Sequence, residues 1–379
     1  MSTQPTIKGW CPGAYKPMMS GDGLILRIRP RLARLTAKQA LGMCDLAQQY
    51  GSGHIDLTNR ANLQIRGIKE ADHEALLEAL NQLDLLDADP ALEGRRNILV
   101  TPFYEAGDIT ERLATALTDA LHKLPELPAK FGFAIDTGEA PLLADASADI
   151  RIERSELGLI LRADGTDLGH ETTEATAIND AIKLARWFAN TRTLEQRRMA
   201  QITQQGVTAP RPPSEQPQPS LTATGALLGA AFGSLNAADL AALITTSQAT
   251  ALRTTPWRMF VLEGADMPTN SPFITEAHDP VLSAHACPGA PYCPSATVTT
   301  RPIASVLAKR NRVQVHVSGC SKGCAFSKPC ALTYIGHDGY FDLVRDGCAW
   351  DAPVSRGQCA SDVLRNPSPM RPSDNFLDG

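Results

Sequence analysis

The chain has 379 residues, which is enough for two or three domains of about 150 residues each. Its composition, with 43% hydrophobic residues, 20% charged residues and a net charge of -5, is typical of a globular protein and excludes a disordered chain. The mild acidity and the low aromatic content of 5% argue against nucleic-acid binding. No uncharged apolar run reaches about 18 residues, and the N-terminus lacks a basic region followed by an apolar core. We therefore expect a cytoplasmic protein that neither crosses a membrane nor is secreted.

The first predicted unit covers residues 15–85 and alternates strands with helices. Apolar residues alternate with polar ones up to Pro30, and Thr36 with Gln39 forms a capping-box signature at a helix start. In chain order, the patterns predict a strand over 24–29, a helix over 36–51, one long two-faced strand over 55–66 and a helix over 69–83.

The second predicted unit, residues 90–205, is a mixed α+β lobe. In chain order we expect a strand over 98–101, a helix over 108–124, strands over 130–136 and 149–161, and a long helix over 172–205. Five prolines between Gly206 and Ser220 predict a linker over 206–222. The polar, proline-containing end of the chain predicts a flexible tail over 366–379.

The helix start and the following strand of the first unit recur later in the chain. Residues 234–246 resemble 34–48, and residues 252–264 resemble 56–67 after a short gap. An internal duplication would relate two half-domains by a pseudo-twofold axis. The alternative is a chance similarity between two capped helices that each precede a strand.

Nine cysteines are unevenly distributed, and seven of them lie between residues 287 and 359. An odd number without an export signal favours a metal site over a disulfide framework. Cys287 and Cys293 enclose five residues, whereas Cys320 and Cys324 enclose three. The fold would have to bring these two local pairs together, and they would then form one site with four sulfur ligands.

Three interpretations of this cysteine set remain open. A [4Fe-4S] cluster is favoured because its corners are farther apart than the vertices around a single ion, which suits wide and unequal spacings. Zinc is the second interpretation, although the five-residue gap exceeds the usual two to four. Structural thiols without a metal are the third. Cys330 is either a substitute ligand or a buried small side chain, and no role is assigned to Cys11, Cys44, Cys348 and Cys359.

Positive charge is concentrated near the N-terminus, where residues 1–68 hold nine Lys or Arg and three Asp or Glu. Arg27 and Arg29 share one face of the first predicted strand. One face of the predicted long strand carries four further polar residues, Arg60, Asn62, Gln64 and Arg66. Guanidinium and carboxamide groups offer several planar donors, so this surface suits a ligand with several carboxylates. The alternative is a solvated strand face.

Longer motifs carry a specific resemblance. They are CPGAYKPMMSGDGL (11–24), LTNRANLQIRG (57–67), RRNILVTP (95–102), LPAKFGFAIDTG (127–138), TPWRMFVLEG (255–264) and ACPGAPYC (286–293). Together with the cysteine spacing, they resemble the siroheme-dependent sulfite and nitrite reductase superfamily. Within this superfamily they are most similar to the precorrin-3B synthase family of aerobic cobalamin biosynthesis.

The resemblance implies an α+β fold with the duplicated, pseudo-twofold architecture of the sulfite and nitrite reductases. Paired ferredoxin-like half-domains would cover residues 15–85 and 223–283. Two α+β catalytic lobes would cover residues 90–205 and 284–362, and the second lobe would bind an iron-sulfur cluster.

The resemblance also implies roles for single residues. The [4Fe-4S] cluster would be held by Cys287, Cys293, Cys320 and Cys324. Cys324 would also bridge to siroheme or to a second iron, which could be a mononuclear non-haem ion. Arg60, Arg96 and Lys130 fall where the reductases place catalytic cations, but Gly132 stands where they have a second lysine. The expected substrate-binding residues are Arg27, Arg29, Asn62, Gln64 and Arg66.

The implied activity is an oxygen-dependent monooxygenation of precorrin-3A, which hydroxylates the meso carbon between rings A and D and closes a γ-lactone. Since no GxGxxG motif follows a predicted strand, we expect NADH to act only through an electron-donor reductase partner. The missing cation at Gly132 favours this activity over a first alternative, a siroheme-dependent sulfite or nitrite reductase. The second alternative is a non-catalytic module that binds an iron-sulfur cluster or a tetrapyrrole.

Overall fold

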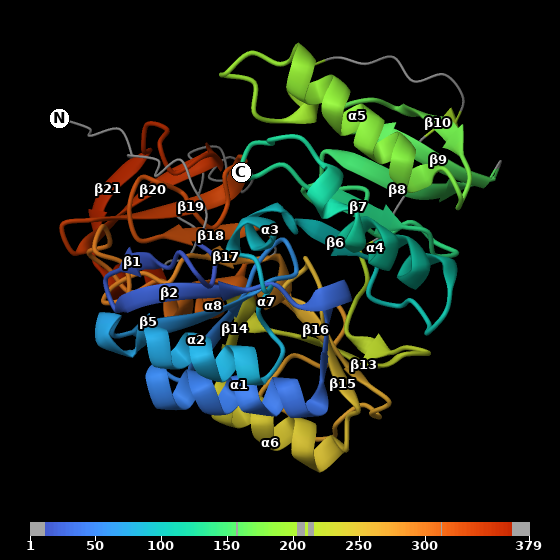
Figure 1. Cartoon of the computed structure of the whole chain (residues 1–379). Helices are drawn as coiled ribbons and strands as arrows, with labels where there is room; N and C mark the ends of the chain where they lie inside the picture. Colours follow the sequence, from blue (N-terminus) through green and yellow to red (C-terminus); the bar gives the residue numbers. More distant parts are fainter. Residues whose placement is uncertain (1–11, 157, 203–208, 211–215, 312, 366–379) are drawn as a thin grey trace. The chain divides into compact units, whose positions relative to one another are not determined.

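The computed structural model describes residues 12–156, 158–202, 209–210, 216–311 and 313–365 (Figure 1). The predicted tail, parts of the predicted linker (206–208 and 211–215) and Cys11 lie outside the described residues. The chain divides into two compact units, a larger one built mainly on Gly23–Ala277 and a smaller one built mainly from His278 onward.

The first half-domain of the larger unit begins with β2. Its elements are β2 (Gly23–Ile28), β3 (Arg34–Thr36), α1 (Ala37–Tyr50), β4 (His54–Leu57), β5 (Leu63–Ile68) and α2 (His73–Gln82), with 3-10 turns at Arg31–Ala33 and Glu70–Asp72; β1 (Met18–Ser20) precedes them in the chain. The Thr36 hydroxyl accepts the N–H of Gln39 at 3.3 Å, and the Gln39 side chain accepts the N–H of Thr36 at 3.0 Å. The predicted capping box at this helix start is confirmed.

The second half-domain repeats this order. Its elements are β12 (Ser220–Leu221), β13 (Gly225–Gly229), a 3-10 turn (Ala231–Gly233), β14 (Ser234–Asn236), α6 (Ala237–Ser247), β15 (Ala251–Thr254) and β16 (Met259–Glu263). The 3-10 turns of the two halves contain a left-handed residue at the same place, Leu32 with φ 54° and Phe232 with φ 57°. The expected duplicated architecture is therefore confirmed, and chance similarity does not explain the repeat.

The two half-domains exchange short strands. β14 of the second half pairs antiparallel with β4 of the first, and β3 of the first half pairs antiparallel with β15 of the second. The first N–H group of helix α1 and of helix α6 likewise donates a hydrogen bond to the other half-domain. Ala37 donates to the carbonyl of Thr250 at 3.0 Å, and Ala237 donates to the carbonyl of Gly53 at 2.9 Å. Each sheet is thus completed by a strand from the other half, so the halves form one structural unit.

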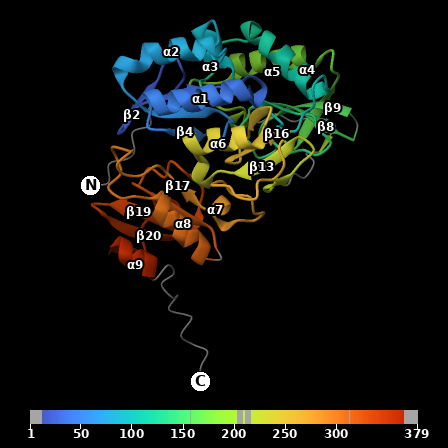
Figure 2. The same ribbon diagram turned by 90° about the horizontal axis from the view of Figure 1, so that it is seen from below.

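One apolar core joins the two halves. It contains inward-facing residues of both sheets, such as Leu26 and Leu63 in the first and Leu252 and Phe260 in the second, all with 0% exposure. Helices α1 and α6 pack side by side over it (Figure 2). Because side chains alternate between the faces of a strand, the opposite face of each sheet can carry the polar residues.

The predicted single strand over 55–66 is wrong, because this segment is a β-hairpin. β4 and β5 pair antiparallel and meet at Leu57 and Leu63. In the turn between them, the Thr58 hydroxyl accepts the N–H of Arg60 at 3.3 Å, and Ala61 has a left-handed φ of 54°. The chain therefore reverses where the alternation of apolar and polar residues continues unbroken. The segment from Leu252 to Gly264 is likewise a hairpin, made of β15 and β16.

An α+β lobe follows the first half-domain. Its elements are α3 (Pro90–Arg95), β6 (Ile98–Val100), α4 (Ile109–Asp119), β7 (Phe133–Asp136), β8 (Ile150–Ser155), β9 (Gly158–Ala163), β10 (Leu168–Thr172), α5 (Ala177–Thr191) and β11 (Ala209–Pro210), with 3-10 turns at Leu121–Lys123 and Met199–Gln201. The strand order is β11-β10-β9-β8-β7-β6, with β6, β7 and β8 parallel. Helices α4 and α5 cover one face of this sheet (Figure 1).

The predicted helix over 172–205 is too long at both ends. Its expected start belongs to β10, and α5 ends at Thr191. The buried stripe of α5 ends with Phe188, because the next positions at helical spacing are the polar Arg192 and Gln196. Because the segment beyond Thr191 has no apolar face, continuing the helix would bury no further apolar surface.

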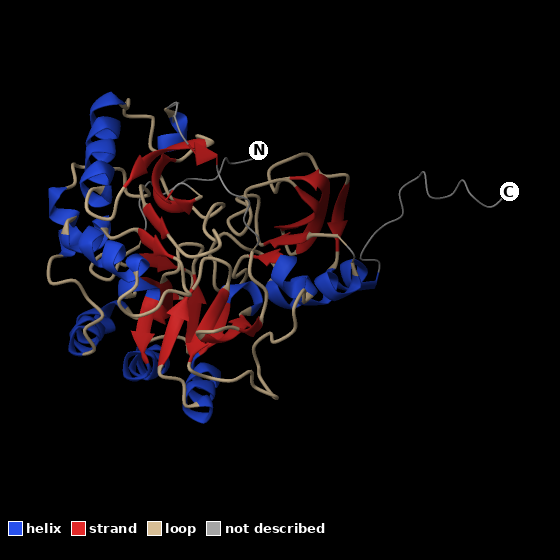
Figure 3. Cartoon of the chain, turned by 90° about the vertical axis from the view of Figure 1, so that its right-hand side faces the viewer, coloured by secondary structure: helices blue, strands red, loops and turns tan. Residues whose placement is uncertain are grey.

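The smaller unit is a sheet with helices packed against it. Its elements are α7 (Pro280–Ser283), β17 (His285–Ala286), α8 (Arg301–Arg310), β18 (Val315–Ser318), β19 (Cys330–His337), β20 (Tyr340–Gly347), β21 (Ser355–Gln358) and α9 (Ala360–Arg365). The strand order follows the sequence, β17 to β21, and β17, β18 and β19 are parallel. Figure 3 shows the strands of the chain in red and its helices in blue. The expected α+β fold class is confirmed. Across the described parts of the chain, no helix is long and apolar enough to span a membrane.

Candidate functional site

The four cysteines of the predicted metal site lie in two loops of the smaller unit. Cys287 and Cys293 follow β17, and Cys320 and Cys324 follow β18. β17 and β18 are neighbouring parallel strands, so both loops leave the same edge of the sheet. The N–H of Gly319 donates to the sulfur of Cys287 at 3.2 Å, which joins the two loops directly.

The four thiols also influence one another electrostatically. Burial raises the pKa of Cys320, and the neighbouring Cys293 and Cys287 raise it further, against the opposing effects of the Lys322 N–H and ammonium groups. Burial likewise raises the pKa of Cys324, and Cys320, Cys287 and Cys293 add to that shift. All four sulfur atoms therefore lie within one small region.

Glycines allow the two cysteine loops to approach closely. A Cβ atom on Gly319 would lie 2.6 Å from the Cβ of Ala296 and 3.3 Å from the Cα of Gly289. The first distance is too short for a side chain unless the loops shift, and the second is tighter than an ordinary van der Waals contact. Gly289 itself has a left-handed φ of 69°, and a Cβ on it would lie 2.7 Å from the Thr300 hydroxyl. Side chains at these positions would push the loops apart.

Four thiols are a donor set that suits an iron-sulfur cluster. Among the residues that the structure describes, no group of three or more His, Cys, Asp or Glu side chains is arranged to hold a metal ion. The corners of a [4Fe-4S] cube are farther apart than ligands around one ion, and its ligands are cysteine thiolates. The two loops therefore fit a cluster by their ligand type and by their close, glycine-dependent approach.

Cys330 fits the second of its two interpretations, a buried small side chain, rather than a substitute ligand. It is buried at the start of β19, where its sulfur contacts the carbonyl of Gln314 at 3.3 Å. Cys44 is buried in α1, where burial raises its pKa to about 12. Cys348 is buried after β20, and Cys359 lies beside Ser361 and Asp362 before α9. These cysteines have partners or core positions of their own.

Most of the predicted arginine row is paired with polar side chains inside the larger unit. Arg27 donates to Gln64 at 3.0 Å across β2 and β5, and Arg66 pairs with Asp56 at 3.4 Å. Arg29 pairs with Glu93, which is buried with it. A substrate carboxylate would have to compete with these acidic partners. Asn62, the remaining expected residue on this face, is 7% exposed.

Arg96 also has an internal partner. Its guanidinium pairs with Asp87 at 2.9 Å and donates to the carbonyl of Arg29 at 2.8 Å, and only 7% of the residue is exposed. These bonds fix the start of β6 against the end of β2. The described contacts of Arg96 are with Asp87 and with the backbone of Arg29 and not with Arg60 or Lys130.

Arg60 lies at the tip of the β4–β5 hairpin, so its expected place on one strand face with Asn62, Gln64 and Arg66 is wrong. The turn directs its side chain toward the lobe, where it donates to the carbonyl of Lys130 at 2.8 Å and to the Ser147 hydroxyl at 3.0 Å. The Lys130 residue itself is exposed. Of the three expected catalytic residues, Arg60 thus contacts the backbone of Lys130.

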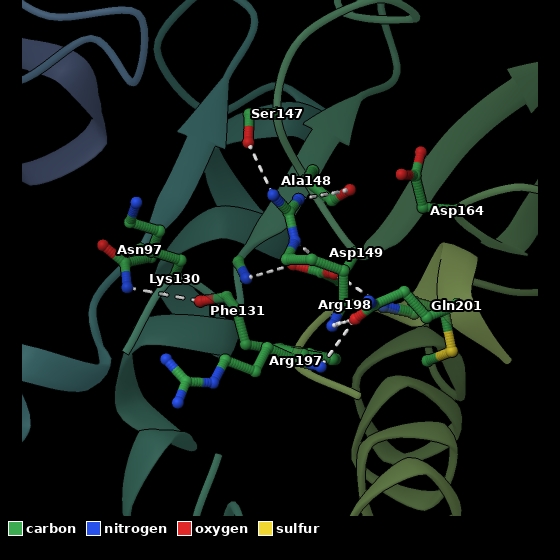
Figure 4. A network of polar contacts seen from close by, with 12 residues as sticks. Asn97, Lys130, Phe131, Ser147, Ala148, Asp149, Asp164, Arg197, Arg198 and Gln201 are labelled. Atoms are coloured by element: carbon green, nitrogen blue, oxygen red, sulfur yellow. Dashed lines mark hydrogen bonds and ion pairs between the residues drawn. The ribbon is translucent and has the colours of Figure 1, made fainter. Parts of the chain in front are cut away.

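A buried carboxylate organises this site. Asp149 is 0% exposed and accepts the N–H of Gly132 at 2.9 Å, the Arg198 guanidinium at 2.8 Å and the N–H of Met199 at 2.8 Å. Arg198 in turn donates to the Ser147 hydroxyl at 3.2 Å (Figure 4). Ser147 therefore accepts hydrogen bonds from both Arg60 and Arg198. We call Arg60, Ser147, Arg198 and Asp149 the Ser147 network.

Gly132 lies directly beside this network. A Cβ atom on Gly132 would lie 3.0 Å from the carbonyl of Asn97 and 3.5 Å from the Arg60 guanidinium. A lysine at this position would place its side chain against Arg60 and crowd the carbonyl of Asn97. The glycine thus leaves room beside Arg60 and removes one positive charge.

Sequence reasoning missed Ser147, Asp149 and Arg198. They lie on the loop after β7 and on the segment after α5, at separations of up to 51 residues. None belongs to a motif whose spacing suggests chemistry, since the network forms only when the lobe folds. The adjacent basic residues Arg197 and Arg198 were the one local signal, and such pairs are usually solvated.

Comparisons with known proteins define the class. Residues 16–83 match the family described as nitrite/sulfite reductase ferredoxin-like half domain. The solved structure of the Mycobacterium tuberculosis NirA protein has the same fold, with a TM-score of 0.62 and 14% identity, over 91% of this chain and 79% of that one. The chain therefore has the fold of the sulfite and nitrite reductases, and the resemblance to their superfamily is confirmed.

Within this class, the chain is similar to a precorrin-3B synthase from Sinorhizobium sp, with 29% identity over 392 residues, 91% of this chain and 84% of that protein. It is also similar to a ferredoxin–nitrite reductase from Synechococcus elongatus, with 30% identity over 141 residues, but this covers only 34% of this chain and 27% of that enzyme. The relatives are named as enzymes, which favours an oxidoreductase over a non-catalytic binding module.

Proposed function

We propose that the chain catalyses the conversion of precorrin-3A to precorrin-3B, as an oxygen-dependent monooxygenase of aerobic cobalamin biosynthesis. The observation that carries this proposal is the similarity to a precorrin-3B synthase along 91% of the chain. Similarity to a nitrite reductase covers only 34% of it. Gly132 beside Arg60 supports the same choice, because it reduces the positive charge available for a small oxyanion and leaves room for a larger substrate.

The proposed reaction consumes one dioxygen molecule and two electrons. One oxygen atom enters the product as a hydroxyl group on the meso carbon between rings A and D, and the ring A acetate closes a γ-lactone. The other atom leaves as water after taking up two protons. The electrons would come from NADH through a reductase partner, because the chain has no GxGxxG motif for binding a dinucleotide.

The two cysteine loops would hold the [4Fe-4S] cluster through Cys287, Cys293, Cys320 and Cys324. By the resemblance to the reductases, Cys324 is the candidate bridge to siroheme or to a mononuclear non-haem iron. A cluster supplies single electrons, and an iron with an open position supplies oxygen activation. The Gly319 N–H, which donates to the Cys287 sulfur, would stabilise the negative charge of the bound cluster.

The residues of the Ser147 network would bind and orient the substrate. Precorrin-3A carries acetate and propionate carboxylates around its ring, and Arg60 and Lys130 offer positive charge from neighbouring loops. Asp149 holds Arg198 in place through a buried ion pair, so that guanidinium is oriented before the substrate arrives. Arg27, Arg29 and Arg66 would hold the strand framework through their acidic and amide partners rather than bind the substrate directly.

One experiment separates the proposed activity from its alternatives. The protein is purified without oxygen, its absorption spectrum, iron and acid-labile sulfide are measured, and precorrin-3A, a reductant and oxygen are then supplied. We expect a product that contains one additional oxygen atom, identified by its mass, together with a stoichiometric loss of oxygen. A siroheme spectrum with sulfite- or nitrite-dependent electron consumption and no hydroxylated product would overturn the proposal in favour of a reductase.

A further inference from the structure

A cavity of about 190 Å³ lies in the larger unit where both hairpin turns meet the loop after β7. The turns contribute Asn59 from the first half-domain and Pro256 and Trp257 from the second. The loop contributes Leu142, Ala146 and Ser147 among other residues. Segments from both half-domains and from the lobe thus line one cavity.

The two turns are equivalent in the duplicated architecture. Each turn begins with a threonine whose hydroxyl accepts the backbone N–H of the residue two positions later. The Thr58 hydroxyl accepts the N–H of Arg60, and the Thr255 hydroxyl accepts the N–H of Trp257, both at 3.3 Å. Each ends in a left-handed residue, Ala61 with φ 54° and Arg258 with φ 61°. Trp257 therefore occupies in the second half the position that Arg60 occupies in the first.

The loop that forms the opposite wall is held by buried charged groups. Arg151 is 2% exposed and donates to the carbonyls of Leu143 at 2.7 Å and Ala146 at 2.5 Å. The Asp136 carboxylate accepts the N–H groups of Leu142 at 2.8 Å and Leu143 at 2.7 Å. Because these bonds fix the loop, the cavity is formed before any ligand binds.

The lining suits an aromatic ring, and two arginines that do not line the cavity, Arg60 and Arg198, add positive charge beside it through their bonds to Ser147. Trp257 is half-buried and packs partly against the apolar cluster that contains Leu143 and Ala148, so its ring is held in place. Ser147 also lines the cavity, and its hydroxyl oxygen accepts hydrogen bonds from Arg60 and Arg198. The cavity is smaller than the roughly 300–1,000 Å³ of sites that enclose a drug-sized ligand. It would therefore hold part of a large molecule.

We infer that this cavity binds one pyrrole ring of the tetrapyrrole substrate, with Trp257 against the ring face and Ser147, Arg60 and Arg198 toward its carboxylate arms. The inference rests on the proposed function for the identity of the ligand. It assigns Trp257 and Ser147 as substrate-binding residues. The exposed Asp145, which also lines the cavity, repels a carboxylate and so directs the acidic arms toward Ser147.

The test is an anaerobic titration with precorrin-3A, followed by tryptophan fluorescence and by calorimetry. Three variants are compared with the wild-type protein: W257L, W257F and the control W187F. Trp187 is half-buried on α5 of the same unit and lies outside the cavity lining. We expect W257L to bind roughly three- to tenfold more weakly, whereas W257F keeps an aromatic ring and changes affinity less. W187F should bind as the wild type does.

Fluorescence supplies a second readout that does not depend on affinity or turnover. A ring held against Trp257 should quench its emission, so W257F should show a smaller ligand-induced quench than the wild type and W187F. Equal affinity of W257L and wild type would overturn the inference, as would equal quenching in W257F. Quenching by NADH but not by precorrin-3A would also overturn it, because the cavity would then hold a different ring.

The outcomes separate this inference from the proposed function. If the wild type binds precorrin-3A through Trp257 but yields no hydroxylated product, the proposed activity is wrong and the binding site stands. If the wild type makes the product and W257L binds equally well, the site is wrong and the activity stands. If the wild type binds no precorrin-3A, both are overturned.

Discussion

Arg66 and Glu263 occupy equivalent positions in the two half-domains and carry opposite charges. Each lies at or near the end of the second strand of its hairpin, one residue before a glycine with left-handed φ, Gly67 at 74° and Gly264 at 75°. Each pairs across its hairpin with a residue of the opposite sign. Arg66 pairs with Asp56 at 3.4 Å, and Glu263 pairs with Arg253 at 2.7 Å.

The duplication has thus kept the geometry of a cross-strand ion pair while its polarity was reversed. Such a reversal costs little when both members change together, because the pair stays neutral and its hydrogen bonds are rebuilt. Glu263 also binds Arg34 of the exchanged strand β3 through two bonds of 2.8 Å. Glu263 therefore connects the two half-domains. The ion pair between Arg66 and Asp56, by contrast, lies within the first half-domain.

The first prediction concerns Glu263→Gln. The guanidinium groups of Arg34 and Arg253 lower the pKa of Glu263 from 4.5 to about 2. Its contribution to stability is therefore complete above about pH 4.5 and is lost as the pH falls toward 2. We expect the variant to lose about 2 kcal/mol at pH 7 and to show a weaker loss of stability between pH 4.5 and 2. Thermal unfolding across this range measures both effects.

The control for this prediction is Glu70→Gln, because Glu70 is exposed in the 3-10 turn before α2. Its unfolding should follow that of the wild type at every pH. The prediction is wrong if Glu263→Gln and the wild type lose the same stability between pH 4.5 and 2. The Glu263 carboxylate would then not link the half-domains.

The second prediction concerns Asp136→Asn. Burial raises the pKa of Asp136 to about 6, against two backbone hydrogen bonds and with a further increase from Glu153. Because the pKa in the folded protein lies above the usual 3.8, the free energy of unfolding falls as the pH rises from about 4 to 6. The asparagine keeps an acceptor for Leu142 and Leu143 but carries no charge. We expect it to gain about 2 kcal/mol at pH 8 and nothing at pH 4.

Denaturant unfolding at the two pH values tests this expectation, with Asp145→Asn on the same loop as the exposed control. A loss of stability at pH 8 would mean that the ionised carboxylate is needed to hold the loop. The loop that lines the cavity beside Trp257 would then need the negative charge of Asp136 and not only a hydrogen-bond acceptor at this position.

The third prediction concerns Cys320→Ser. A missing thiolate leaves one iron of a [4Fe-4S] cluster without its protein ligand, so we expect acid-labile sulfide to fall to near zero after anaerobic purification. Cys330→Ser is the matched control, since Cys330 is buried ten residues later in β19 and bonds to the Gln314 carbonyl. This control should keep its iron and sulfide. Full retention of sulfide in Cys320→Ser would refute the proposed ligand set.

The fourth prediction concerns Arg60→Ala. Loss of the guanidinium removes a charged partner for a substrate carboxylate, and we expect precorrin-3A to bind about tenfold more weakly. The cluster should remain, because Arg60 lies in the larger unit and the cysteines lie in the smaller one. Arg95→Ala, which removes an exposed arginine from the end of α3, is the control and should bind normally. Unchanged affinity of Arg60→Ala would mark the hairpin tip as structural only.

Much of the fold was predictable, because its signals are local. The capping box at Thr36, the proline that ends β2 and the two cysteine pairs each depend on residues a few positions apart. The repeat was visible for the same reason, since both halves carry an apolar residue before a helix cap. The hairpin over 55–66 was missed because its alternation of residue types continues through the turn, and a period of two does not show where a chain reverses.

By itself, the sequence determined the α+β class, the duplication and the resemblance to the sulfite and nitrite reductases, because these are encoded in short-range patterns and contiguous motifs. Only the tertiary structure decided which charges are available. It paired Arg29, Arg66 and Arg96 with Glu93, Asp56 and Asp87, and it placed Arg60 at a hairpin tip beside Ser147. The physical reason is that the pairing of a charged side chain depends on which segments meet across the fold, and a pattern along one strand carries no information about its partner.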